Sequence, residues 1–97
     1  MTLQDIRNDI DKIDYRIHDL LNERAQLAIK VGKIKIQEDN EKTEFFRPDR
    51  EREILTAISQ YNKGPLSDEA IVNIFKIIIH ECLQLQVAMN KRQTADD

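Results

Sequence analysis

The chain has 97 residues and a formal net charge of −3 at pH 7, with 34% charged and 5% aromatic residues. This length predicts one domain, and the negative balance argues against nucleic-acid binding by bulk electrostatics. The single cysteine, Cys82, excludes an internal disulfide and favours a reducing compartment. Because we find neither a signal-peptide pattern nor an apolar run of membrane-spanning length, we expect a cytoplasmic protein with no membrane partner.

Residues 3–37 are predicted to form one very long helix with Thr2 as its N-cap. Its apolar residues repeat at spacings of four and three, the pattern of a heptad seam: Ile6, Ile10, Ile13, Ile17, Leu20, Leu27, Val31 and Ile34. A helix of this length measures about 50 Å, whereas a compact domain of this size has a radius of gyration of about 13 Å. Two shorter helices cannot cover such a rod, so the sequence predicts an intertwined homo-oligomer, most simply a two-fold homodimer.

Two shorter helices are predicted after a polar loop at residues 37–44. The first covers about residues 48–62, with Pro48 in its first turn and Gly64-Pro65 as a stop signal. The second covers about residues 67–91, with Ser67 as its N-cap and a frayed end at residues 93–97. No strand is predicted, so we expect a single all-α domain over residues 1–97, with one very long and two shorter helices.

Arg24 occupies a seam position of the long helix where every neighbour in the seam is apolar. A buried guanidinium needs an anionic partner, which is either an internal salt bridge or a ligand. Lys35 lies eleven residues on and returns to within about 20° of the same face. Two cations on one inward face favour an anionic ligand. Arg7 is about 25 Å from Arg24 along the helix, so it reaches that site only from the other chain of an antiparallel dimer and otherwise reads as a surface residue.

Further candidate site residues lie on the two shorter helices. Arg50 and Glu51 precede the apolar pair Ile54-Leu55 by one turn, so one face of them points inward, whereas Arg52 and Glu53 read as solvated. Gln86 lies beside the seam of the third helix, where it serves either as an interhelical amide or as a hydrogen-bond donor to a ligand. His18 and His80 have no metal-ligand spacing, so we expect no metal site.

Several segments together resemble the all-helical AroQ class of chorismate mutases. They are Ile6-Arg7, residues 11–14, residues 20–24, residues 31–35, Arg47-Pro48 with Arg50-Glu51, and residues 64–67. The resemblance covers residues 3–89. It is strongest with the mutase domain of bifunctional chorismate mutase–prephenate dehydratase proteins, which leaves open whether a second enzyme domain follows Asp97.

The resemblance implies an interlocked homodimer that converts chorismate to prephenate, in phenylalanine and tyrosine biosynthesis, without metal or cofactor. By position, Arg7 crosses from the partner chain and Arg24 binds a substrate carboxylate within its own chain. Lys35 and Gln86 match the two groups that contact the ether oxygen. At the head of the second helix, Arg50 and Glu51 match an Arg-Glu pair whose carboxylate accepts a hydrogen bond from the substrate hydroxyl.

Two further positions of the implied substrate site depart from the best-known single-domain members. Cys82 stands where a serine often helps to hold a carboxylate, and a thiol is the weaker donor. Arg47 stands where an aspartate is sometimes seen near the ring hydroxyl.

Three alternatives to the mutase remain at this stage. An isochorismate pyruvate-lyase resembles the same fold and binds a similar dianion. A non-catalytic helical dimerisation or regulatory module would explain the heptads, although the inward Arg24 and Lys35 count against it. A mutase-like domain that only binds product or an aromatic amino acid ranks last, because no separate regulatory domain is visible in the sequence.

Overall fold

The computed structural model describes residues 1–38 and 45–95, with side chains up to residue 90. It contains three helices, α1 (Leu3–Glu38), α2 (Pro48–Tyr61) and α3 (Asp68–Ala95), and no strand among the described residues. The all-α class with one long and two shorter helices is therefore confirmed. The polar loop predicted between the first two helices falls largely on residues 39–44, outside the described residues.

The end of α3 differs from the expectation, because this helix continues to Ala95 rather than fading near residue 91. No glycine or proline occurs between residues 91 and 95, so nothing in the backbone chemistry interrupts the helical hydrogen bonds there. The frayed end predicted for residues 93–97 is thus wrong for residues 93–95, and residues 96–97 lie outside the described part of the chain.

The starts of α1 and α3 are capped as the sequence predicts. The Thr2 hydroxyl accepts a hydrogen bond from the backbone N–H of Asp5 at 3.1 Å, and the Asp5 carboxylate accepts one from the backbone N–H of Thr2 at 3.0 Å. This reciprocal arrangement is a capping box, and the backbone hydrogen bond from Thr2 holds the pKa of the Asp5 carboxyl below its ordinary value. At the start of α3, the Ser67 hydroxyl accepts from the N–H of Ala70 at 3.0 Å.

The turn between α2 and α3 is organised by the side chain of Asn62. Its amide nitrogen donates to the Leu66 carbonyl oxygen at 2.9 Å and to the Asp68 carboxylate at 2.7 Å, and its oxygen accepts from the N–H of Gly64 at 3.2 Å. Gly64 has a φ of 74°, which favours glycine over any residue with a side chain. The helix α2 ends at Tyr61, one residue earlier than expected, with Asn62 as its C-cap just before the predicted Gly64-Pro65 stop signal.

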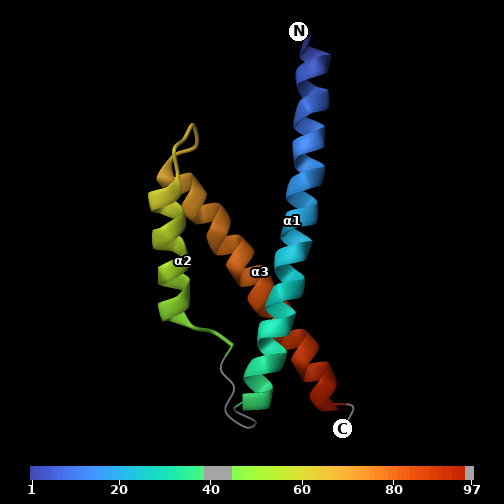
Figure 1. The fold of residues 1–97 in the computed structure, drawn as a ribbon, viewed down its shortest axis with the longest axis vertical. Coiled ribbons are helices and arrows are strands. Elements are labelled where there is room, and N and C mark those ends of the chain that lie inside the picture. Colours follow the sequence, from blue (N-terminus) through green and yellow to red (C-terminus); the bar gives the residue numbers. More distant parts are fainter. Residues whose placement is uncertain (39–44, 96–97) are drawn as a thin grey trace.

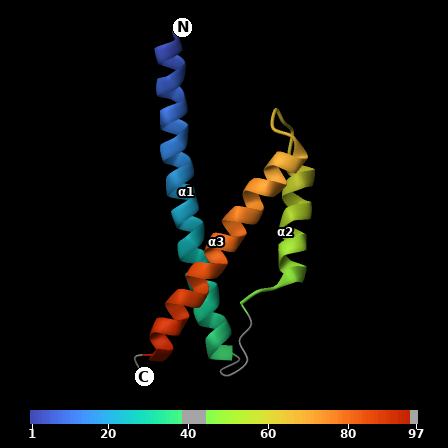
Figure 2. The same cartoon turned by 180° about the vertical axis from the view of Figure 1, so that it is seen from behind.

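The third helix, α3, lies across both other helices. It packs along α2 near its own N-terminal end and crosses α1 near the C-terminal end of α1, and the two other helices do not pack on each other in the described part of the chain (Figures 1 and 2). The single chain is accordingly extended, measuring 58 × 29 × 15 Å with a radius of gyration of 17.1 Å. This value exceeds the roughly 13 Å expected of a compact chain of this length.

The N-terminal half of α1 projects beyond the rest of the chain (Figure 1). Its apolar seam is between 44% and 64% exposed at every position: Leu3, Ile6, Ile10, Ile13, Ile17 and Leu20. Such a continuous exposed apolar stripe marks an interaction surface in soluble proteins. The single chain therefore leaves the predicted seam uncovered along half of its longest helix.

By length and composition, α3 is apolar enough to cross a membrane, which corrects the expectation that no run of the sequence reaches that length. The most apolar 18-residue window within Asp68–Asn90 has a mean hydropathy of 1.4, and only 11% of this window is buried within the single chain. Core helices of soluble proteins meet the same criterion, and the polar residues Gln86 and Asn90 are among the few buried residues of α3. Much of the apolar surface of α3, including Ile77, remains for another surface to cover.

Candidate active site

A cavity of about 310 Å³ lies between the C-terminal half of α1, the segment before α2, the first turns of α2 and the middle of α3. All three helices contribute to it. Its charged and polar lining consists of seven side chains predicted from the sequence: Arg24, Lys35, Arg47, Arg50, Glu51, Cys82 and Gln86. Apolar side chains such as Leu27, Ile54 and Leu83 form part of the remaining wall. The structure thus gathers residues from distant parts of the sequence around one space with an excess of positive charge.

Two of the cations of α1, Arg24 and Lys35, lie on the cavity side of the helix and are half-buried. Neither forms an ion pair within residues 1–38 and 45–90. The internal salt bridge considered for Arg24 is therefore not present in this part of the chain. Two partly desolvated cations facing a cavity without a protein carboxylate of their own attract an anion from solution.

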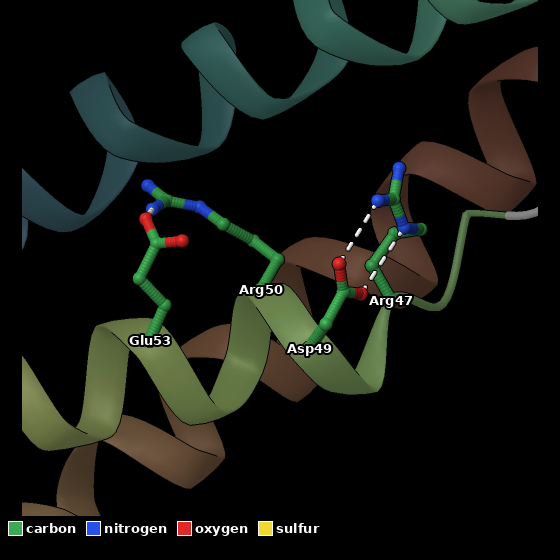
Figure 3. Close-up of polar contacts among 4 residues, drawn as sticks. All are labelled: Arg47, Asp49, Arg50 and Glu53. Carbon is green, nitrogen blue, oxygen red and sulfur yellow. Dashed lines mark hydrogen bonds and ion pairs between the residues drawn. The ribbon is translucent and has the colours of Figure 1, made fainter.

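The two arginines at the head of α2 are each held by a carboxylate of the same helix. Arg47 donates to the Asp49 carboxylate through Nε at 3.2 Å and Nη2 at 3.0 Å, and Arg50 forms an ion pair with Glu53. Figure 3 shows both guanidinium groups lying between α2 and α1. All four side chains are more than half exposed, and exposed pairs of this kind are weak. A bound anion with two carboxylates can therefore compete for these guanidinium groups.

The hydrogen bonds from Arg47 hold the pKa of the Asp49 carboxyl below its ordinary value. Replacing Arg47 with alanine is expected to raise that pKa toward the ordinary value, since the main cause of the shift is removed. Because the shift is downward, the pair is intact above the ordinary aspartate pKa and is lost only as the pH falls through the lowered value. An NMR titration of the Asp49 carboxyl measures this, with the exposed Arg52→Ala variant as the control. An unchanged midpoint in Arg47→Ala would contradict the assignment.

Glu51 is half-buried, and Cys82 and Gln86 are each 8% exposed at the cavity wall. The Gln86 amide nitrogen donates to the backbone carbonyl of Ala28 on α1 at 2.7 Å. Both interpretations of Gln86 from the sequence are therefore compatible, because one N–H joins the helices and the amide also lines the cavity. An NH₂ group has a second N–H to donate.

One predicted site residue lies outside this cavity. Arg7 is an exposed residue near the far end of α1 and does not belong to the lining. Two other cations of α1, Lys30 and Lys33, are exposed. The sequence reasoning missed the aromatic pair Phe45-Phe46, which lines the cavity ahead of Arg47. The only available signal for this pair was its position next to the charged head of α2.

The sequence model of the family described as chorismate mutase type II matches residues 6–87 of the chain. The bifunctional chorismate mutase/prephenate dehydratase of Pseudomonas aeruginosa is 38% identical over 86 residues, and that of Aquifex aeolicus is 42% identical over 88 residues. Each alignment covers 87% of this chain and 24% of the relative. The chain thus spans about a quarter of the length of these curated relatives.

Two solved structures share this fold. Chorismate mutase from Thermus thermophilus (Form II) superimposes with a TM-score of 0.81 at 31% identity, covering 87% of this chain and 92% of that chain. Chorismate mutase from Helicobacter pylori in complex with prephenate has a TM-score of 0.81 at 28% identity, covering 92% of this chain and 93% of that chain. The three-helix fold is that of these all-helical chorismate mutases. The chain belongs to the chorismate mutase type II family.

Proposed function

We propose that this protein catalyses the 3,3 rearrangement of chorismate to prephenate. The observation that supports it most directly is the placement of Arg24, Lys35, Arg47 and Arg50 around one cavity of about 310 Å³. Chorismate carries two carboxylates, and arginine binds carboxylates through two parallel hydrogen bonds. The names of the relatives and membership of the family point to the same substrate.

The reaction requires a folded, near-attack conformer of a flexible dianion rather than a nucleophile. In our proposal, Arg24 and Arg50 bind the carboxylates, with Arg47 and Cys82 as further contacts in the substrate site. Glu51 accepts a hydrogen bond from the ring hydroxyl. Holding the substrate at both ends brings the two carbon atoms that form the new bond close to each other before the carbon–oxygen bond breaks.

Lys35 and Gln86 act on the reacting bond itself. As the carbon–oxygen bond lengthens, negative charge accumulates on the ether oxygen. An ammonium group and an amide N–H fixed at that oxygen stabilise the transition state more than the bound substrate. Lys35 lies on α1 and Gln86 on α3, and both line the cavity.

We further propose that the active enzyme is an interlocked homodimer. A second chain covers the exposed seam of α1, whose residues Ile6, Ile10 and Ile13 lie in solvent in the single chain. Burying them stabilises the dimer by about 25 cal/mol for each Å² of apolar surface. The same docking brings Arg7 of the partner chain to the cavity that holds Arg24, which completes the carboxylate site.

The relatives combine this activity with prephenate dehydratase in one chain, so we place the product in a reaction sequence that continues by dehydration, catalysed by a domain fused downstream or by a separate protein. The free thiol of Cys82 is compatible with a reducing compartment, and we place the enzyme in the cytoplasm.

The direct test is the loss of chorismate absorbance with purified protein in buffer containing EDTA, with prephenate identified as the product. We expect saturable turnover without an added cofactor. Matched reactions with isochorismate and release of pyruvate distinguish the lyase. No turnover of chorismate by a folded oligomer would overturn the proposal, and turnover of isochorismate alone would replace it with the lyase activity.

A further inference from the structure

The crossing of α1 and α3 is unusually close at Gly32, which is the one buried residue of α1. A Cβ atom added at Gly32 would lie 2.6 Å from Nδ2 of Asn90 and 3.5 Å from Cγ of Gln86. The first distance is shorter than any ordinary contact, so a methyl group fits only if α3 or the Asn90 side chain moves. The polar side chains of α3 thus pack directly on the bare backbone of α1.

Two hydrogen bonds occupy this crossing. The Gln86 amide nitrogen donates to the Ala28 carbonyl oxygen at 2.7 Å, and the Asn90 amide nitrogen donates to the backbone carbonyl of Gln86, also at 2.7 Å. Gln86 and Asn90 are 8% and 3% exposed. Ala28 and Gly32, two small residues four positions apart on α1, therefore face the amide side chains of α3, which are also four positions apart.

Gly32 also opens the acceptor that Gln86 uses. A helical side chain lies over the turn that precedes its own Cα, so a side chain at position 32 would lie over the turn that contains the Ala28 carbonyl. That carbonyl belongs to the helical hydrogen-bond ladder, and a second donor reaches it only where the helix surface is uncovered. A Cβ at position 32 would make only an ordinary 3.5 Å contact with Cγ of Gln86, but it would meet Nδ2 of Asn90 at 2.6 Å. Gly32 therefore keeps this path open by allowing α3, and Gln86 with it, to approach α1 closely.

The bond to Ala28 fixes which end of the Gln86 amide faces α1. A carbonyl oxygen only accepts hydrogen bonds, so the NH₂ group rather than the oxygen of Gln86 must point toward α1. One N–H is then anchored, and the direction of the other is set by the planar geometry of the amide. A side chain held in this way loses little conformational freedom when it donates to a ligand.

We propose that Gly32 is a positioning residue for catalysis, because it allows the Ala28 carbonyl to anchor the Gln86 amide at the cavity. The inference rests on the proposed function, in which Gln86 donates to the ether oxygen of the substrate. Gly32 does not line the cavity, so its effect on turnover passes through Gln86.

The test is a double-mutant cycle between Gly32→Ala and Gln86→Ala with kcat and KM as readouts. Gly32→Ala is expected to lower kcat by about tenfold to a hundredfold with a smaller change in KM, because displacement of a donor by about 1 Å has effects of that size. In the Gln86→Ala background the same substitution is expected to change kcat less than about twofold. A merely structural role would lower kcat by the same factor in both backgrounds.

A second pair of variants covers the case in which Gly32→Ala does not fold. Asn90→Ala removes the atom that a Cβ at position 32 would meet, so Gly32→Ala/Asn90→Ala is expected to fold with a helical spectrum. Because its Cβ then makes only an ordinary 3.5 Å contact with Cγ of Gln86, its kcat should stay within about twofold of that of the matched control Asn90→Ala. Gly32→Leu/Asn90→Ala places a longer side chain over the turn of the Ala28 carbonyl and should lose kcat by about tenfold or more. Equal kcat values in Gly32→Leu/Asn90→Ala and Asn90→Ala would overturn the inference.

The cycle also separates failure of the inference from failure of the proposed function. If Gln86→Ala lowers kcat but the effect of Gly32→Ala is additive to it, the positioning role is wrong and the role of Gln86 stands. If Gln86→Ala itself leaves kcat unchanged, the proposed role of Gln86 is wrong and the positioning role falls with it.

Discussion

Replacing Lys35 with alanine is expected to lower kcat by about a hundredfold to a thousandfold while leaving the protein folded. Removal of one preorganised donor to a developing negative charge has an effect of this size, equivalent to about 3–4 kcal/mol. Lys35 is half-buried at the cavity and has no ion-pair partner among the described residues. Its charge is therefore available to a ligand rather than neutralised by the protein.

The pattern of the kinetic change distinguishes this role from simple substrate binding. A group that acts on the ether oxygen only in the transition state lowers kcat and kcat/KM together, whereas a group that binds substrate and transition state alike raises KM. We expect the first pattern for Lys35→Ala and a large contribution from KM for Arg24→Ala.

The matched control is Lys33→Ala, on the same helix but exposed. It removes the same charge from the chain without touching the cavity, so kcat is expected to stay within about twofold of the unmodified protein. Steady-state kinetics at several chorismate concentrations, with far-ultraviolet circular dichroism to verify folding, provide the comparison. Turnover of Lys35→Ala equal to that of Lys33→Ala would rule out the proposed role.

Most of the fold follows from local sequence signals. The alternating spacings of four and three define long amphipathic helices, and Thr2, Pro48 and Ser67 mark their starts within one residue of the observed bounds. These signals are local because a cap or a helical period depends on residues within one or two turns. The end of α3 was not predicted, because residues 91–95 carry no strong local signal that starts or stops a helix.

The site was predictable where helical geometry alone determines it. Arg24 and Lys35 share a face by their spacing, and both line the cavity. The side-chain pairs Arg47–Asp49 and Arg50–Glu53 depend on rotamers that no periodicity specifies. The close crossing at Gly32 depends on how α1 and α3 approach each other, which is a property of tertiary packing that the sequence of either helix leaves undetermined.

The exposed seam of α1 leads to a second prediction with a large expected effect. If Arg7 serves the cavity of the partner chain, Arg7→Ala and Arg24→Ala each remove one guanidinium from both sites of a homodimer. Each variant alone is therefore expected to lose more than about a hundredfold in kcat/KM, the size of effect measured when a buried carboxylate loses a charged partner.

Mixing the two inactive variants is expected to restore activity if the sites are shared between chains. In a mixed dimer, one site combines the intact Arg24 of the first chain with the intact Arg7 of the second, while the other site lacks both. Equimolar chains that are unfolded and refolded together form mixed dimers about half of the time, so about a quarter of the original specific activity is expected to return. The activity is measured after refolding, with each variant refolded alone as the control.

The alternatives give different numbers in the same experiment. A site built from one chain only would lack Arg24 in half of the chains, and Arg7→Ala would retain nearly full activity by itself because Arg7 would be a surface residue. A non-catalytic helical module would show no activity before or after mixing. If the mixture recovers activity and neither variant does so when refolded alone, the two arginines must come together across a chain boundary. They cannot meet within one chain, because they lie about 25 Å, or about five helical turns, apart on the same helix.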